Sequence, residues 1–546
     1  MVGDTSTADE ITDRTETSRG DSDGPSPTDS AESTTTDPVE ARLADALERV
    51  AHGAVVSVPS VLLEQGLALA FTATLTNGFS AAAFGVFVVA RRFQAVLLSL
   101  SMGVRGGVSR FLPNAETDVE RDLVATFGSA LQVGVAALFG LALYLAAPAI
   151  ADLTPGVTGG GADTGTFVQY LRVFAVGLPA VVWFFAVVTV MRGLEEVGAL
   201  NLLQRVAFPL AQLGVAAAGV LLFDRLVVVA VGVVFLSAVV GTVGAVWLVT
   251  ARGLRPRLSG PGARAVQRKY LRFVAPLFPA SFATTAQRLG FYPLIALFLS
   301  GTAGGVFAVG VLVGHLVRLP LVALNQFVPP VAAALHEEGH REALSRFYHV
   351  SSRLVLVGVT ALAVPAIVYR RAVMALFGPV FVEAAWLLPG FVLAQFGACA
   401  AGSVGILLTM TDNQRALLVV NTVITLFLAV VSIPLTVEFG LPGLVASYLL
   451  MLTLNNGLEV LVLYRAEGLQ PFTRAHLRPL AAAVPFAAVA VAAQTLLGSP
   501  AVAAVVGTLL GLVVYGLALR AFGFEPAERR LVGTLVARYR RASPLG

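Results

Sequence analysis

The sequence predicts an all-α integral membrane protein with about fourteen transmembrane helices. Hydrophobic residues make up 56% of its 546 residues, charged residues only 13%, and the mean hydropathy is +0.81. An average soluble domain carries about 25% charged residues, so a soluble fold could not bury this much apolar surface. After residue 53, helix-length apolar runs follow one another with short polar loops between them. The loops also differ in charge from one side to the other.

The N-terminal part is polar and then amphipathic. Residues 1–40 are rich in Asp, Glu, Ser and Thr and have almost no apolar side chains, so we expect a disordered acidic tail in the cytoplasm. Residues 41–53 place Leu43, Leu47 and Val50 on one helical face, which predicts an amphipathic helix at the membrane interface.

The lengths of the apolar runs and the positions of the polar loops between them then place the membrane spans. We expect spans 1 to 6 to form an N-lobe over residues 54–250, and spans 7 to 12 a C-lobe over 271–464. Spans 13 and 14 follow over 478–520, and a basic cytoplasmic tail closes the chain over 521–546. The predicted spans lie near residues 54–76, 81–104, 122–148, 166–190, 198–222, 227–250, 271–299, 302–330, 350–369, 383–411, 415–436, 441–464, 478–498 and 500–520.

The cations indicate orientation, because Arg and Lys gather in cytoplasmic loops. One set of loops collects Arg105, Arg110, Arg252 and many further cations, and the C-terminal tail adds Arg541 and others. The opposite loops are nearly free of cations. We therefore expect a multi-pass protein of the cell membrane with both termini in the cytoplasm.

An internal repeat indicates two related lobes. The tripeptide Gly85-Val86-Phe87 near the start of span 2 recurs as Gly305-Val306-Phe307 near the start of span 8, and Asn201 recurs as Asn421, both 220 residues apart. Because each lobe has an even number of spans, the repeat should be parallel, with a central cavity and the substrate between the lobes.

Several stretches resemble a known transporter family. These are "LTNGFSAAAFGVFVVARRFQ" (75–94), "GVRGGVSRFLPN" (103–114), "LNQFVPPVAAALHEEGH" (324–340), "ALFGPVFVEAAWLLPGFVLAQFG" (375–397), "LLTMTDNQRALLVVNTVITL" (407–426) and "VEFGLPGLVASYLL" (437–450). In order and spacing they are similar to polysaccharide and oligosaccharide-lipid flippases of the multidrug/oligosaccharidyl-lipid/polysaccharide exporter superfamily.

The resemblance implies a two-lobed flippase that moves a lipid-linked oligosaccharide from the cytoplasmic to the outer leaflet by alternating access. The implied substrate is a polyprenyl- or dolichyl-phosphate-linked oligosaccharide for polysaccharide or glycoprotein biosynthesis. Glycosyltransferases or a glycan ligase of the same pathway would be partners, besides membrane lipids. We expect no cofactor and no nucleic acid.

Ionisable residues within spans mark the candidate site, because charge at bilayer depth is costly. The candidates for substrate binding are Glu64, Arg91, Arg92, Arg288, His315 and Arg318. The excess of Arg suits an anionic head group, since guanidinium binds phosphate oxygens through paired hydrogen bonds. Arg205 and Glu459 also lie within spans, but near cytoplasmic ends where snorkelling or pairing is the simpler interpretation.

We expect Arg288 and Arg318 to share one anionic site with Arg91 or Arg92. Neighbours on a helix point about 100° apart, so at most one of Arg91 and Arg92 should face substrate. Glu64 is either the counter-charge of these cations or a proton-coupled group. His315 can titrate near neutrality or serve as a hydrogen-bonded core residue.

Three other functions are alternatives to the flippase. A multidrug or cation antiporter of the same superfamily needs acidic residues in its cavity, whereas this chain shows mainly Arg. A membrane metalloprotease is suggested by His336-Glu337-Glu338-Gly339-His340, but Gly339 weakens the helix that would align the two imidazoles, and no third metal ligand is apparent. A glycosyltransferase needs a sizeable extramembrane region. No phosphate-binding Gly-rich loop ends in Lys-Ser or Lys-Thr, and we expect a transporter that is not an enzyme.

Overall fold

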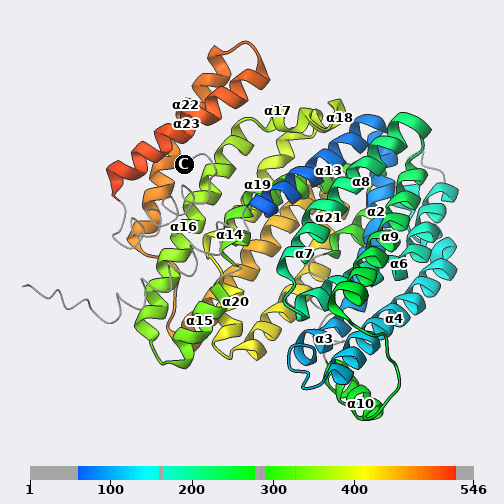
Figure 1. The fold of residues 1–546 in the computed structure, drawn as a ribbon. Coiled ribbons are helices and arrows are strands. Elements are labelled where there is room, and N and C mark those ends of the chain that lie inside the picture. The colour runs from blue at the N-terminus through cyan, green and yellow to red at the C-terminus, as the bar shows by residue number, and fades with distance from the viewer. Residues whose placement is uncertain (1–58, 159–163, 277–284, 286–288, 326–327, 524–546) are drawn as a thin grey trace, which may run out of the picture.

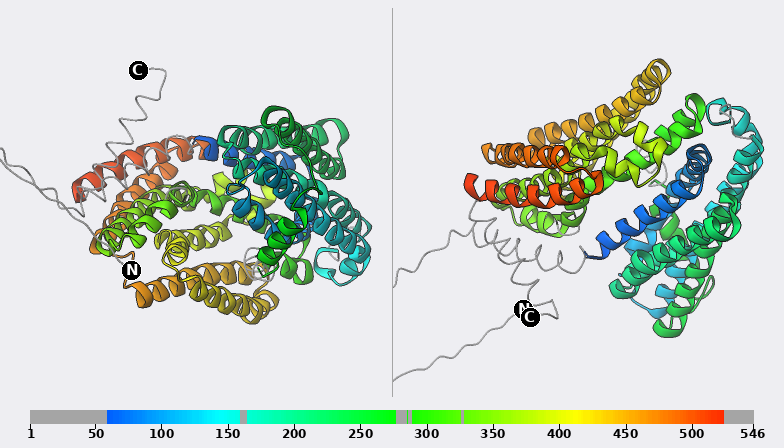
Figure 2. Two further views of the ribbon diagram at one scale, coloured as in Figure 1. Left: turned by 60° about the horizontal axis from the view of Figure 1, so that its bottom comes forward. Right: turned by 90° about the horizontal axis from the view of Figure 1, so that it is seen from above.

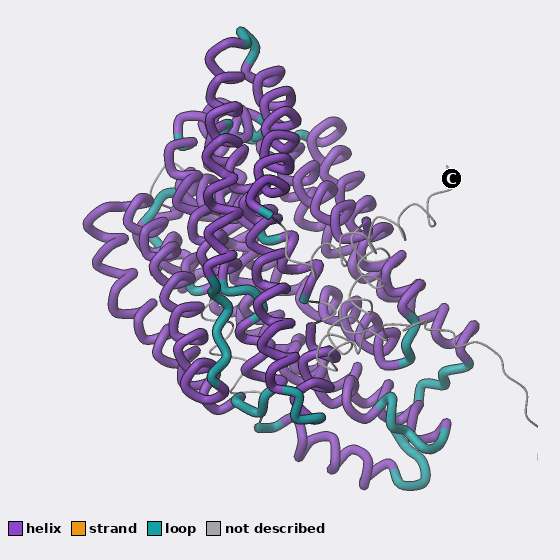
Figure 3. The backbone as a smooth tube through the Cα atoms, turned by 90° about the vertical axis from the view of Figure 1, so that its left-hand side faces the viewer, coloured by secondary structure: helices purple, strands orange, loops and turns teal. Residues whose placement is uncertain are grey.

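The computed structural model describes residues 59–158, 164–276, 285, 289–325 and 328–523, and every regular element among them is helical (Figures 1 and 3). A helix over residues 59–78 comes first. The elements up to the middle of the chain are α2 (Ala81–Ser101), η1 (Met102–Arg105), α3 (Gly106–Phe111), α4 (Asp118–Asp152), α5 (Pro155–Thr158), α6 (Thr164–Gly193), α7 (Val197–Asn201), η2 (Leu202–Ala207), α8 (Phe208–Ala218), η3 (Gly219–Phe223), α9 (Leu226–Arg252) and α10 (Ala263–Val274).

The remaining elements are α12 (Phe291–Phe298), α13 (Gly301–Val317), α14 (Leu319–Leu324), α15 (Val328–Glu337), α16 (Arg341–Val368), α17 (Arg370–Ala375), α18 (Pro379–Glu383), η4 (Ala385–Leu387), α19 (Leu388–Ala400), α20 (Val404–Met410), α21 (Gln414–Glu467), η5 (Arg474–His476), α22 (Leu477–Leu496) and α23 (Pro500–Phe522). The expected acidic tail, the interfacial helix and the basic C-terminal tail fall on residues 1–58 and 524–546, outside the described residues.

Ten helices of the described residues are long and apolar enough to cross a membrane, which makes the chain a multi-pass helical membrane protein. α21 runs for 54 residues and holds two predicted spans, because Gly440 breaks it with φ 62° and ψ −137°. Such a positive φ costs glycine little, so the chain can bend there between spans 11 and 12. The total of fourteen spans and the limits of the two lobes stay predictions.

One predicted span differs in form. The stretch expected to run continuously over 302–330 divides at Arg318, where α13 ends and α14 begins. Pro320 stands in the first turn of α14, and its ring has no N–H and clashes with the carbonyl four residues earlier. The proline therefore ends α13 and places Arg318 at the junction of two helices.

The chain folds into two groups of helices, which separate when the molecule is seen from above (Figure 2). The helices coloured blue to blue-green lie on one side and those coloured yellow-green to red on the other. We call the helices from 59–78 to α9 the first half, and those from α12 to α21 the second half. α22 and α23 lie beside α16. Tyr369, at the C-terminal end of α16, donates a hydrogen bond from Oη to Ala490 O of α22 at 2.7 Å.

The repeated tripeptides meet where α2 crosses α13. Both helices begin with a serine cap, since Ser80 Oγ accepts from Ala83 N and Ser300 Oγ from Ala303 N. A Cβ on Gly85 would lie 1.6 Å from Gly301 O, and a Cβ on Gly305 would lie 2.9 Å from Ala81 O. The glycines of the repeat therefore let the two backbones touch, which larger side chains would prevent.

Further contacts between the halves lie at the same end of the bundle, near α17 and α18 at the top of Figure 1. Asn77 Nδ2 donates to Leu376 O at 2.8 Å, and the rings of Phe84 and Phe381 are 6.5 Å apart. This is the end where the cation-poor loops lie, so by the predicted orientation it faces outside. In this structure the two halves are joined at this end, which we call the outer end after the predicted orientation.

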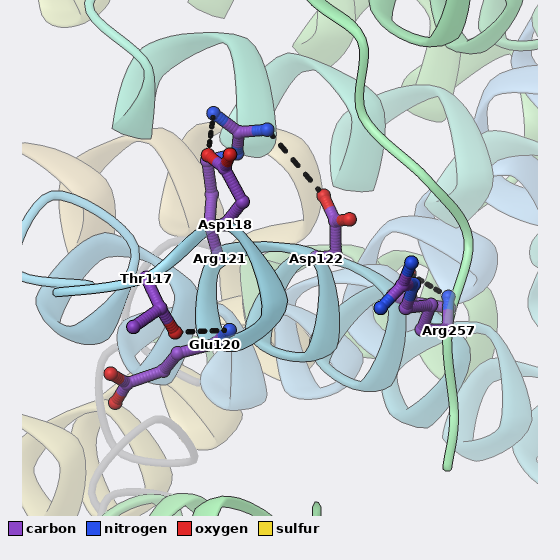
Figure 4. A network of polar contacts seen from close by, with 7 residues as sticks. Thr117, Asp118, Glu120, Arg121, Asp122 and Arg257 are labelled. Carbon is purple, nitrogen blue, oxygen red and sulfur yellow. Dashed lines mark hydrogen bonds and ion pairs between the residues drawn. The ribbon is translucent and has the colours of Figure 1, made fainter. Parts of the chain in front are cut away.

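The opposite end carries α10, which packs on α3 and α4 of the first half. Tyr270 is buried there, donates to Val104 O at 2.9 Å, and fills a socket whose walls include Gly107 and Gly128. At the neighbouring start of α4, Arg121 bridges Asp118 at 3.0 Å and Asp122 at 3.7 Å (Figure 4). The Tyr270 contacts fasten the segment between the halves to the first half, whereas the Arg121 ion pairs lie within α4 itself.

Candidate functional site

A cavity of about 450 Å³ lies within the first half. Its wall comes from the helix over 59–78, α2, α6, η2, α8 and α9, and α13 of the second half adds only Ala308 and Leu312. The polar and charged side chains of the wall are Glu64, Thr72, Arg91, Arg92, Gln94, Gln204, Gln212 and Ser237. A cavity between the lobes was expected, whereas this one is lined mainly by a single half.

The helix over 59–78 presents one face to the cavity. Glu64, Leu67, Ala68, Phe71 and Thr72 line it at spacings of three, one, three and one residues. Residues three and four apart lie on the same face of a helix, so these five residues form one face that is turned toward the cavity. Glu64 and Phe71 are separated by about two turns, or about 10 Å along the axis.

Arg91 and Arg92 both line this cavity, although adjacent residues on α2 were expected to point apart. Each guanidinium lies over an aromatic ring: Arg91 Cζ is 5.6 Å from the centre of Phe71, and Arg92 Cζ is 4.7 Å from that of Tyr292. Within the described residues neither guanidinium has an ion pair or a hydrogen bond. The long flexible side chains let both residues reach one space despite their different directions.

Glu64 is the acidic member of the cavity wall, and Arg205 is its partner. Arg205 Nε lies 3.8 Å from Glu64 Oε2, and Arg205 Nη1 donates to Ser60 Oγ at 3.3 Å. Pairing was the simpler interpretation of Arg205, and the structure shows it. Glu64 was expected to be either the counter-charge of the cavity cations or a proton-coupled group, and the cation that it pairs with in this structure is Arg205.

Span 5 supplies a part of the wall that the sequence analysis missed. η2 is a π-helical segment that carries Gln204 and Arg205, and α8 continues with Phe208 and Gln212 on the same wall. Gln204 Oε1 is buried and has no hydrogen-bond partner among the described residues. The signal was present, because Gln204 and Gln212 stand about two turns apart on one side of an otherwise apolar span.

The other predicted site residues lie elsewhere. Arg288 is outside the described residues. Arg318 does not line this cavity and instead lies close enough to Glu459 of the second half for an electrostatic interaction. His315 is exposed, with Nδ1 2.9 Å from Val311 O, which does not fit a buried core histidine. The expected single site of Arg91 or Arg92 with Arg288 and Arg318 stays a prediction.

The zinc-like pair of histidines is divided between two helices. His336 lies near the end of α15, whereas His340 precedes α16, and Gly339 turns the chain between them with φ 72°. His340 Nε2 lies 3.5 Å from Glu338 Oε2. Among the described residues, no group of three His, Cys, Asp or Glu side chains could hold a metal.

We therefore expect that changing both His336 and His340 to Ala leaves transport unchanged. Purified wild-type protein should contain less than stoichiometric zinc by elemental analysis, because two imidazoles on separate helices lack the alignment that such sites need. Stoichiometric zinc that disappears in the double variant together with activity would contradict this expectation.

Comparison with known proteins finds no matching family model and no matching curated relative. Solved structures do match. A lipid II flippase, MurJ, in an inward closed conformation gives a TM-score of 0.66 at 10% identity, over 85% of this chain and 97% of that chain. An inward-facing multidrug resistance MATE family transporter of the MOP superfamily gives 0.61 at 16% identity, over 76% of this chain and 98% of that one.

A further match is a MOP superfamily transporter from Pyrococcus furiosus, reported with a binding pocket of reverse polarity that suggests a different function. It gives a TM-score of 0.50 at 16% identity, over 89% of this chain and 99% of that chain. At these identities the likeness establishes the fold. The chain thus shares its helical membrane fold with these three solved proteins.

Proposed function

We propose that the protein is a flippase that moves a lipid-linked oligosaccharide from the cytoplasmic to the outer leaflet by alternating access. The observation that carries the proposal is the pair Arg91 and Arg92, which line the cavity without a counter-charge among the described residues. The single carboxylate of the cavity wall, Glu64, is engaged by Arg205. The polarity of the wall therefore favours an anionic ligand.

The cavity cations can offset the cost of taking a phosphate out of water. A charge taken out of water must be compensated by opposite charge and hydrogen bonds, or it is costly. Two guanidinium groups beside aromatic rings can supply this for a phosphate through charge-assisted hydrogen bonds, each worth about 1.5 to 3 kcal/mol. An organic cation would meet repulsion instead, which argues against a multidrug antiporter.

The remaining polar wall suits a glycan. Gln204 and Gln212 offer amide groups that can hydrogen-bond sugar hydroxyls, whereas Gln94 and Ser237 are buried and already donate to Phe174 O and Val233 O. Aromatic rings such as Phe71 and Phe208 supply apolar surface beside them. A phosphate joined to a sugar matches this combination, and the lipid joined to the phosphate remains in the bilayer.

We place the protein in the cell membrane with both termini in the cytoplasm, where glycosyltransferases of the same pathway would load the lipid. A glycan ligase or polymerase would consume the product in the outer leaflet. The fold shared with the lipid II flippase and with the transporter of reversed pocket polarity supports this assignment and a protein that transports without catalysis.

The proposal is tested in cells that lack the chain. Glycan-charged lipid should accumulate in their cytoplasmic leaflet, and expression of the wild-type chain should reverse the accumulation. Uptake and efflux of organic cations should be the same in both strains. Unchanged lipid levels together with altered cation efflux would replace the flippase by a cation exporter.

A further inference from the structure

We propose that the seam between the helix over 59–78 and span 5 is the doorway through which the hydrocarbon chain of the substrate passes from the cavity into the bilayer. Span 5 here means α7, η2, α8 and η3. The inference rests on the proposed function and adds the route of the lipid to it.

A doorway is required by the chemistry of a lipid-linked substrate. Its phosphate and sugars need the polar cavity, whereas its isoprenoid chain gains nothing by leaving hydrocarbon. A head group at Arg91 and Arg92 therefore demands an opening in the side of the bundle. The cavity lies within the first half, so the opening must pass between two of the helices that line it.

The packing of those helices identifies the weakest seam. In the most apolar stretch of span 5, 11% of the residues are buried, compared with 61% for α6, which also lines the cavity. From residue 62 to 74 no residue of the first helix is buried, and from 202 to 215 no residue of span 5 is. Few buried contacts would be lost if these two helices parted.

The two helices are joined near the ends of the cavity. At the inner end, Arg205 binds Glu64 and Ser60. At the outer end, Gly78 lies against Val220, whose Cγ2 would be 2.4 Å from a Cβ placed on the glycine. Both contacts use residues of the π-helical segments η2 and η3. Such segments are frequent at functional sites, and here they flank the cavity-lining part of α8.

The outer contact allows the seam to be fastened covalently. A Cβ at position 78 would lie 3.1 Å from Val220 Cβ, just below the separation of about 3.5 to 4.5 Å found in disulfides, so a small outward shift of the two helices brings the pair into range. Gly78→Cys with Val220→Cys should therefore form a bond on oxidation. The only natural cysteine, Cys399, is buried and can be replaced by Ala to give a cysteine-free parent.

A matched control fastens the same span to its other neighbour. A Cβ on Gly232 of α9 would lie 3.7 Å from Val215 Cβ of α8. Gly232→Cys with Val215→Cys thus holds span 5 to α9 and leaves the seam free. Both variants are compared oxidised and reduced in proteoliposomes, with a fluorescent polyprenyl-phosphate-linked disaccharide as the probe.

We expect oxidation to lower transport at least tenfold in the Gly78/Val220 variant, reduction to restore it, and the control to transport in both states. Equal transport by both oxidised variants would overturn the doorway and leave the flippase intact. A cysteine-free parent that binds and moves no probe would remove the proposed function and the doorway together.

A second readout does not depend on the cysteines. A diazirine placed on the isoprenoid chain of the same probe should label the helix over 59–78 and span 5 in the wild-type chain. Labelling confined to α2, α13 and α14 would place the chain between the two halves and contradict the proposal.

Discussion

Replacing both Arg91 and Arg92 by Ala is expected to abolish transport of the lipid-linked probe while leaving folded protein in the membrane. Each guanidinium can contribute about 1.5 to 3 kcal/mol through charged hydrogen bonds to phosphate. The loss of one should weaken binding roughly 10- to 150-fold, and the loss of both should weaken it further. The fold should tolerate the change because neither side chain has an ion pair among the described residues.

Lysine variants separate charge from geometry. Arg91→Lys and Arg92→Lys should restore transport only in part, since lysine keeps the charge but lacks the planar fork that matches phosphate. A matched control is Arg172→Ala, because Arg172 also lies over a ring, that of Tyr144 at 5.1 Å, but does not line the cavity. Transport and probe binding are measured per folded protein. If the double Ala variant transported like Arg172→Ala, the anion site would be wrong.

Replacing Gly85 by Ala is expected to prevent the halves from joining at their outer end. The added Cβ would lie 1.6 Å from Gly301 O, a backbone atom that cannot rotate away. Overpacking of this kind typically costs about 1 to 3 kcal/mol. The outer-closed state should then be disfavoured roughly 5- to 150-fold, and a cycle that needs this state should slow accordingly.

The reactivity of a thiol in the cavity toward an external reagent measures how far the outer-closed state is disfavoured. Thr72 lines the cavity, so a Thr72→Cys reporter in the cysteine-free parent should react faster with an impermeant thiol reagent from outside when Gly85 is Ala. Gly134→Ala in α4 is the matched control, since nothing lies within 4 Å of its added Cβ. Equal labelling and equal transport by the two variants would contradict the role of the crossing.

The helical membrane class was accessible from the sequence because it rests on local runs of apolar residues. The offset that relates Gly85 to Gly305 also relates the capping serines Ser80 and Ser300, and the structure brings these helix starts together. Arg91, Arg92 and Glu64, which line the cavity, could be singled out from the sequence because ionisable residues are conspicuous in apolar spans.

Other features depend on contacts between residues that are far apart in the chain. The pairing of Glu64 with Arg205 joins residues 141 positions apart, and nothing in the pattern of either span specifies the partner. The π-helical turns of span 5 are defined by hydrogen-bond register, which composition does not reveal. Pro320 ends α13 beside Arg318, and the electrostatic interaction of Arg318 with Glu459 joins two spans that no local pattern relates. Whether Arg318 shares a site with Arg91 stays a prediction.

The most direct test of the central claim is the transport of defined substrates by the purified chain in proteoliposomes. The fluorescent polyprenyl-phosphate-linked disaccharide should move from one leaflet to the other, as measured by its protection from an impermeant quencher. The same lipid without phosphate and a lipophilic organic cation should not be moved. Movement of the cation, with the phosphate-linked glycan left in its original leaflet, would contradict the account.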